Sequence, residues 1–226
     1  MNKTSIRYIT FIDIMGFSNF VIRNSHRTVE RRMEIFQSII NSHEAKLKSI
    51  SKDINNKEDI IRTVAFSDSV LIISSDDSRD SLESILFCSQ LIITSCMLNK
   101  IPIKGAVSQG KITADFQKSV FFGEPLIDAY NLAEQLHMYG IILDEKVEKK
   151  ARMMKFDLNP FCVKTKIPTK NGNITHFAIN WVNWMKITYN KKAIFVLESL
   201  YEQVSGMPRK YIDNTLDFLK VCLDKN

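Results

Sequence analysis

The stretch Phe11-Ile12-Asp13-Ile14-Met15-Gly16-Phe17 places an aspartate at the end of a run of alternating β-branched and aromatic residues. This pattern predicts a buried strand that enters a tight turn at Gly16. A second aspartate, Asp68, separates two short apolar runs at 60–66 and 70–74, which is typical of a hairpin with the aspartate at its tip. Both carboxylates are therefore expected at strand ends.

Two carboxylates brought together from separate strands repel each other unless a cation lies between them. Hard divalent ions prefer oxygen ligands, so the pair Asp13 and Asp68 predicts a site for a divalent cation. Phosphoryl transfer is the first chemistry that such a site suggests.

Composition narrows the class of protein. A chain of 226 residues is long enough to bury a core without staples. The four cysteines have neither zinc-site nor disulfide spacing and are expected to be reduced core thiols. The N-terminus lacks a long apolar segment, and no run of 18 uncharged apolar residues follows, so a soluble cytoplasmic protein that does not engage a membrane is expected.

The formal net charge of +6 raises the question of nucleic-acid binding. The basic residues are scattered, and pairs such as Arg31-Arg32 and Lys149-Lys150 fall on helical patterns beside acids. These basic residues are therefore interpreted as part of a solvated surface, and no stable nucleic-acid partner is expected.

Periodicity and turn signals predict helices alternating with a mixed sheet, which indicates an α+β domain of ferredoxin-like type. In that arrangement the first strand lies beside the hairpin, which brings Asp13 close to Asp68. Residues 1–185 are expected to form the catalytic domain, and 186–226 a helical extension packed on it. The other expected elements are a helix reaching 55, a helix from 77 or 78 to 99, strands at 101–108, 118–122 and 140–143, a helix opening at Gly123-Glu124-Pro125, a hairpin of 161–166 with 174–181, and terminal helices from about 191.

Four motifs then occur in order, and together they resemble a class III nucleotidyl cyclase domain over roughly residues 6 to 181. The Phe-Ser-Asp form of the second motif and the tail at 208–215 are most similar to the bacterial pyrimidine cyclases of Pycsar antiphage systems. The motifs are Phe-x-Asp-Ile-x-Gly-Phe at 11–17, Phe-Ser-Asp at 66–68, Lys104-Gly105-Ala106-Val107-x-x-Gly110, and Gly123-x-x-Leu126-x-x-Ala129-x-x-Leu132.

The resemblance implies that Asp13, Asp68 and the Ile14 carbonyl bind two divalent cations, Mn²⁺ or Mg²⁺. Such ions lower the pKa of the ribose 3′-hydroxyl, orient it toward the α-phosphorus and neutralise the pyrophosphate leaving group. The resemblance also implies that the backbone N–H groups of Met15, Gly16 and Phe17 wrap the phosphates.

Departures from the family pattern indicate which nucleotide base the protein would bind. Val64 stands where adenylyl cyclases place a base-reading lysine, and Val120 stands where an acidic partner is usual. Neither purine reader is present, which disfavours ATP and GTP. Val64, Phe66 and Phe122 are expected to lie beside the substrate. The Phe122 ring is expected to stack on a pyrimidine base or, alternatively, to be a core residue.

The family's ribose-binding and charge-neutralising residues have only a partial match. Asn131 is in the asparagine position, while Gln135 replaces the usual arginine. Asn131 and Glu134 face the site if the helix has this register. The missing positive charge is expected from Lys104 or from Lys164 and Lys166 in the last hairpin.

The resemblance therefore implies a homodimer with composite sites that converts UTP to 3′,5′-cyclic UMP, an antiphage second messenger for a separate effector. CTP and cyclic CMP are the alternative substrate and product. A second alternative is a non-catalytic nucleotide-sensing or dimerisation module. A diguanylate cyclase is disfavoured because its Gly-Gly-Asp/Glu-Glu/Asp-Phe hairpin is absent from the sequence.

Overall fold

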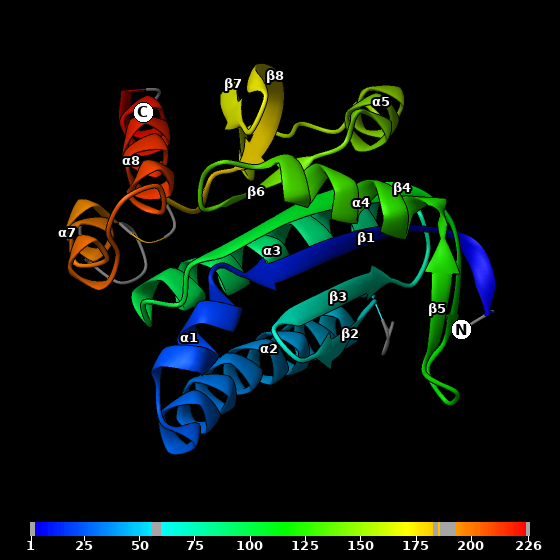
Figure 1. Cartoon of the computed structure of the whole chain (residues 1–226). Coiled ribbons are helices and arrows are strands. Elements are labelled where there is room, and N and C mark those ends of the chain that lie inside the picture. Colours follow the sequence, from blue (N-terminus) through cyan, green and yellow to red (C-terminus); the bar gives the residue numbers. More distant parts are fainter. Residues whose placement is uncertain (1–2, 56–59, 183–184, 186–192, 225–226) are drawn as a thin grey trace.

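A computed structural model describes residues 3–55, 60–182, 185 and 193–224. Within these residues the chain forms one mixed sheet in the order β2-β3-β1-β4-β6-β8-β7, and β5 pairs with β4 (Figure 1). The strands are β1 (Thr4–Ile14), β2 (Ile61–Phe66), β3 (Ser69–Ser74), β4 (Ile103–Asp115), β5 (Val120–Gly123), β6 (Gly140–Leu143), β7 (Cys162–Thr169) and β8 (Gly172–Ile179).

Helices cover both faces of the sheet. α2 and α3 pack on one face against β1, β2 and β3, while α4 lies against β1 and β4 on the other (Figure 1). The C-terminal helices contact each other and the sheet edge at β7. The helices are α1 (Phe17–Arg23), α2 (His26–Asn55), α3 (Arg79–Leu98), α4 (Glu124–Gln135), α5 (Glu145–Met153), α7 (Ala193–Glu198) and α8 (Arg209–Asp224), with a 3₁₀ turn at Tyr201–Gln203.

The centre of the sheet shows why β1 can carry a site at its end. Alternate residues Ile12 and Ile14 are buried in the core, so Asp13 between them faces the opposite side of the strand. β1 pairs antiparallel with β3 on one side and with β4 on the other. Two ladders therefore hold the strand and fix the position of Asp13.

Helix α3 supplies much of the core. Ser78 caps it by accepting a hydrogen bond from the Ser81 amide at 3.3 Å, and Asn99 follows its last turn. Its length and apolar composition would permit a membrane crossing, but 78% of its most apolar window is buried inside the protein. That burial is typical of a core helix in a globular domain.

The expected α+β, ferredoxin-like fold is confirmed, with differences in detail. The β2–β3 and β7–β8 hairpins, the start of α4 and the strand β6 lie where the sequence predicted them. β4 is longer than expected and runs through Gly110, where an added Cβ would lie 3.3 Å from the Pro125 ring. Gly110 thus marks a close approach and not a turn.

One helix was absent from the expectations: α1 is separated from α2, with Gly16 in the left-handed conformation at its start. α5 follows the capping residue Asp144 and carries Lys149-Lys150, which the sequence placed on a helical pattern without giving its bounds. The expected boundary at 185/186 adjoins residues 183–184 and 186–192, which lie outside the described part of the chain. The four cysteines are buried and form no disulfide bond with one another, as expected for core thiols.

Candidate active site

The two aspartates of the sequence motifs lie at adjacent strand ends. Asp13 is opposite Ser69 in the β1–β3 ladder, and the Ser69 hydroxyl donates to Asp13 Oδ1 at 3.2 Å. The next amide, that of Ile14, donates to the Asp68 carbonyl oxygen at 3.0 Å. The hairpin that carries Asp68 is therefore fastened directly to the end of β1. Sequence reasoning did not identify Ser69 as the residue that orients Asp13.

The turn that presents Asp68 has an unusual backbone. Ser67 is a non-glycine residue with φ of 53°. Such a conformation costs roughly 1 kcal/mol and tends to occur where function constrains the chain. The strained residue, Ser67, therefore lies next to Asp68, the expected metal ligand.

The electrostatics of Asp13 fit a cation site. Burial, followed by the negative charge of Asp68, raises the pKa of Asp13 to about 6, while Lys104 and the Ser69 hydroxyl partly oppose the rise. A divalent cation between the two carboxylates would remove the repulsion that contributes to this rise.

The number of ligands also fits a metal that is shared with a substrate. Among the residues that the structure describes, no group of three or more His, Cys, Asp or Glu side chains could hold a metal ion. Two carboxylates and a backbone carbonyl suit Mg²⁺, which commonly uses one or two protein carboxylates together with substrate phosphates. This is the ligand set that the sequence motifs predict for Asp13, Asp68 and the Ile14 carbonyl.

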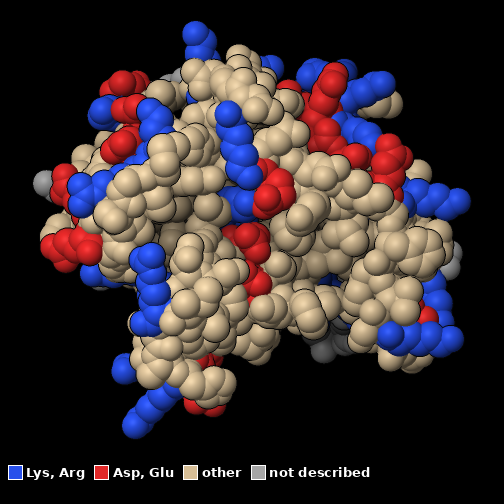
Figure 2. Space-filling model, viewed as in Figure 1, with Lys and Arg blue, Asp and Glu red and all other residues tan. Residues whose placement is uncertain are grey.

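A buried lysine lies on the other side of Asp13. Lys104 is opposite Asp13 in the β1–β4 ladder, its side chain is 6% exposed, and it forms an ion pair with Glu134 of α4. The hydrogen bond from Lys104 lowers the pKa of Glu134, and Lys170 is 3.6 Å from the same carboxylate. Figure 2 shows acidic and basic side chains gathered near the centre of the face that Figure 1 presents.

Helix α4 turns its two candidate residues in different directions. Glu134 reaches Lys104, but Asn131 is exposed and lines a hollow of about 260 Å³ with Asp128 and Lys146. Lys146 is itself held by Glu124 and Asp128. Within one chain, Asn131 therefore lies apart from the Asp13 group.

The expected base-side residues are largely exposed. Phe66 beside the Asp68 turn is 83% exposed, and Phe122 on β5 is 60% exposed. Val64 is two residues before Phe66 on β2 and is partly buried. Phe122 is thus a surface ring and not the core residue of the alternative interpretation.

The lysines of the last hairpin lie on β7, three strands beyond β4 in the sheet order. Lys164 is 3.7 Å from Glu148 and lies over the Phe177 ring, whereas Lys166 is exposed beside α8. The structure does not bring them to Asp13 of the same chain.

The loop after Asp13 is only partly available to phosphate. The Met15 amide donates to the Pro102 carbonyl at 2.8 Å, and the Gly16 carbonyl accepts from Phe20. Gly16 has φ of 72°, a conformation that glycine adopts at little cost. The Gly16 and Phe17 amides therefore remain the better candidates for the expected phosphate contacts.

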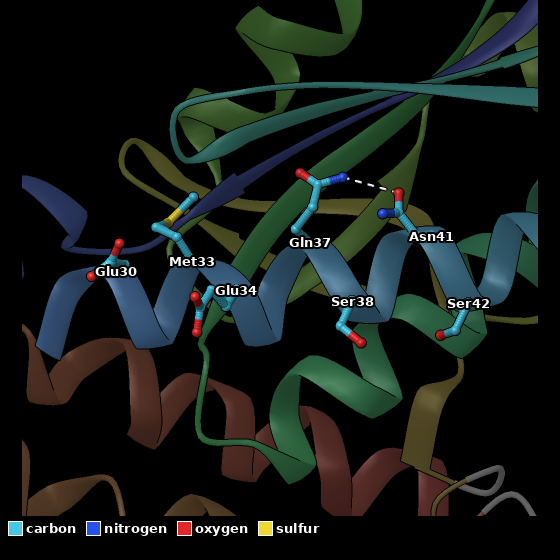
Figure 3. A pocket seen from close by; sticks show the side chains of 7 residues that line it. All are labelled: Glu30, Met33, Glu34, Gln37, Ser38, Asn41 and Ser42. Atoms are coloured by element: carbon cyan, nitrogen blue, oxygen red, sulfur yellow. Dashed lines mark hydrogen bonds between the residues drawn. The ribbon is translucent and has the colours of Figure 1, made fainter. Parts of the chain in front are cut away.

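A hollow of about 850 Å³ runs along α2, away from this group (Figure 3). Its described lining residues all come from one helix and include Glu30 and Glu34, while Gln37 donates to Asn41 at 3.0 Å. Acidic side chains without a cation do not suit a triphosphate.

Comparisons with known proteins agree with this geometry at the level of the fold. No family model and no curated protein matches the chain. Among solved structures, the adenylate/guanylate cyclase/hydrolase from Silicibacter pomeroyi has a TM-score of 0.54 at 14% identity, covering 78% of this chain and 96% of that one. A bacterial light-regulated adenylyl cyclase has a TM-score of 0.53 at 14% identity, covering 82% and 96%.

The guanylyl cyclase domain of the RhoGC fusion protein from the fungus Blastocladiella emersonii has a TM-score of 0.52 at 14% identity, covering 78% and 96%. The chain therefore shares its fold with these adenylyl and guanylyl cyclase domains. At this identity the likeness establishes the architecture and leaves substrate and activity to be argued from the site.

Proposed function

We propose that this chain is a nucleotidyl cyclase that converts UTP to 3′,5′-cyclic UMP and pyrophosphate. The observation that carries the proposal is the placement of Asp13 and Asp68 at adjacent strand ends, with the pKa of Asp13 raised partly by Asp68. The nucleotidyl cyclase fold supports the same class of reaction.

In this proposal, Asp13, Asp68 and the Ile14 carbonyl hold two divalent cations, Mn²⁺ or Mg²⁺. When bound, these ions acidify the ribose 3′-hydroxyl and neutralise charge on the leaving group. The 3′-oxygen forms a bond to the α-phosphorus while the bond to pyrophosphate breaks. Ser69 orients Asp13 through its hydroxyl, and the Gly16 and Phe17 amides contact the phosphates.

A pyrimidine base is favoured by the apolar character of the base side. Val64 and Val120 offer no charge or side-chain hydrogen bond at the positions where purine cyclases read the base. Phe66 supplies an exposed ring beside Asp68, whereas Phe122, on β5 at the other end of β4 from Lys104, can stack on a base only at the site of a second copy. CTP is the alternative substrate, because uracil and cytosine differ by one donor–acceptor exchange on the base edge.

We propose that the active form is a homodimer with composite sites. Asn131, Lys164 and Lys166 lie away from Asp13 in one chain, so they can serve catalysis only at the site of a second copy. Exposed apolar side chains lie on the β2–β3 hairpin beside Asp68, on α4, and on β5 at the opposite end of β4, which suits burial against a partner. They are Phe66, Val120, Phe122, Ile127 and Tyr130.

By the resemblance of its motifs to Pycsar cyclases, we also propose an antiphage role in the cytoplasm. The cyclic nucleotide would activate a separate effector protein.

A non-catalytic nucleotide-sensing module is the second candidate. It is favoured by one observation: Lys104, the cation opposite Asp13, is already paired with Glu134, and Gln135 stands where an arginine is usual. In that case nucleotide binds without turnover.

The test is incubation of the purified protein with Mn²⁺ and each of the four ribonucleoside triphosphates, followed by mass spectrometry. Cyclic UMP as the main product supports the proposal, and cyclic CMP supports the alternative substrate. Cyclic AMP alone would overturn the pyrimidine assignment. Nucleotide binding without any cyclic product would favour the sensing module.

A further inference from the structure

A cavity lined by both polar and apolar residues lies behind the loop that follows Asp13. Its volume is about 560 Å³, within the usual range for small-molecule sites. One wall is formed by Met15, Gly16 and α1, and the opposite wall by the C-terminal segment 200–208. Pro102 and Tyr139 close the end of the sheet between these walls.

Two arginines give the cavity a positive character. Arg32 of α2 is half-buried, and its guanidinium lies 3.8 Å from the centre of the Phe20 ring. Arg23 lies in the last turn of α1. Among the described residues that line the cavity, none is acidic. Burial lowers the pKa of Arg32, with no carboxylate acting against it.

The remaining lining combines hydrogen-bonding groups with apolar surface. Asn19, Gln203 and Ser205 offer donors, while Leu200 and Val204 are apolar. The C-terminal wall is itself anchored, because Arg209 donates to the carbonyl oxygens of Val204 and Tyr201 at 3.0 and 3.4 Å. The cavity therefore has a defined wall on this side.

This cavity is distinct from the carboxylate site. Asp13 lies beside Lys104 and Glu134 on the face covered by α4, whereas the cavity is bounded by α1, α2 and the C-terminal segment. Met15 and Gly16 separate the two. A guanidinium that is half-buried, lies over an aromatic ring and has no acidic residue among the described lining of its cavity is suited to bidentate binding of a phosphate group.

We propose that this cavity binds a phosphorylated small molecule of about nucleoside-monophosphate size, with its phosphate on Arg32 and Arg23 and its organic part against Leu200 and Val204. The inference does not depend on the proposed cyclase activity. It assigns a role to the C-terminal segment 200–208, which forms the wall that the sheet alone would leave open.

The test is isothermal titration calorimetry of the full chain in EDTA, so that metal-dependent nucleotide binding does not contribute. The probes are inorganic phosphate, ribose 5-phosphate, UMP and AMP. We expect at least one of the three organic phosphates to bind more tightly than inorganic phosphate. Arg32→Gln should weaken that binding about tenfold or more, the loss expected for one charge-assisted contact.

The matched control is Arg31→Gln, which removes the same charge from the exposed neighbour on α2 and should change binding less than about twofold. Arg23→Gln tests the second arginine at an exposed position, in case Arg32→Gln disturbs folding as judged by circular dichroism. Asp13→Asn should leave binding intact.

Three results would overturn the inference. The first is no binding of any organic phosphate at 10 mM, roughly the limit set by weak millimolar sites. The others are equal binding by the arginine variants and the wild type, or loss of binding in Asp13→Asn. The last would place the ligand at the carboxylate site. Equal affinity for inorganic phosphate and the organic probes would overturn the assignment of an organic phosphate. If the protein shows no cyclase activity, these binding results still test the inference, because none of them depends on turnover.

Discussion

The two halves of the predicted active site are built differently. The carboxylate half, Asp13 and Asp68, is assembled by strand pairing and a direct backbone hydrogen bond between its two motifs. The second half, represented by Asn131 and Lys166, is spread over α4 and β7 and reaches no common point in one chain. A single chain thus brings the two carboxylates together, and in the proposed homodimer the other half comes from a partner.

The largest expected effect comes from breaking the carboxylate half. Asp13→Ala and Asp68→Ala should each lower kcat at least about a thousandfold, which corresponds to about 4 kcal/mol of transition-state stabilisation. The measurement is cyclic nucleotide formation with Mn²⁺, with circular dichroism to confirm folding. Asp217→Asn, at an exposed aspartate on α8, is the control and should retain activity. Retained turnover in either alanine variant would contradict the metal assignment.

The second prediction concerns the division between chains. An Asp13→Asn copy and an Asn131→Ala copy, each inactive alone, should regain about a quarter of wild-type activity when mixed in equal amounts. Half of the randomly formed dimers are mixed, and each mixed dimer has one intact site of two. Assays after unfolding and refolding the mixture together would measure this. Activity of Asn131→Ala alone near the wild-type value would show that the helix α4 residue has no such role.

The third prediction uses the raised pKa of Asp13, about 6 in the metal-free protein. A carboxyl group whose pKa is higher in the folded than in the unfolded state loses stabilisation as pH rises through the window from about 4 to 6. Asp13→Asn should therefore stabilise the protein in EDTA by at most about 3 kcal/mol at pH 7.5 and much less at pH 4.5.

Urea unfolding at the two pH values, with Asp217→Asn as the control, measures this difference. The prediction would be contradicted if Asp13→Asn were destabilising at pH 7.5, because the folded protein would then stabilise the ionised Asp13 carboxylate instead of destabilising it.

The smallest expected effect concerns the pair beside the site. Glu134→Gln should cost about 1 kcal/mol, because the buried Lys104 loses its charged partner while its attraction to Asp13 remains. The pKa of Asp13 should fall, since Glu134 contributes to raising it. NMR titration of Asp13 and urea unfolding measure the two effects, with the exposed Glu83→Gln as the control. An unchanged pKa would show that Glu134 does not act on Asp13.

The sequence could predict the strand ends that carry Asp13 and Asp68 because the signals for these elements are local. The apolar runs around Asp68 define a hairpin, and Asn171-Gly172 defines another, so both hairpins follow from nearby residues. Pro125 after Gly123 marks the start of α4 in the same way.

The rest required tertiary information. Whether Glu134 or Asn131 faces Asp13 depends on the rotation of α4 against β4, which spacing alone does not determine. α5 is short and strongly charged, although Asp144 followed by acidic residues was a usable capping signal. The cavity near Arg32 is formed only when segment 200–208 packs against α1, so nothing local to either segment announces it.

The central claim, that residues 13 and 68 jointly bind divalent cations against a nucleoside triphosphate, is tested most directly by anomalous diffraction from crystals grown with Mn²⁺ and a non-cyclisable UTP analogue. The account predicts manganese peaks contacting carboxylate oxygens of both aspartates at roughly 2.2 Å, together with phosphate oxygens of the analogue. Peaks elsewhere, or a bound nucleotide with both carboxylates turned away from it, would contradict the account.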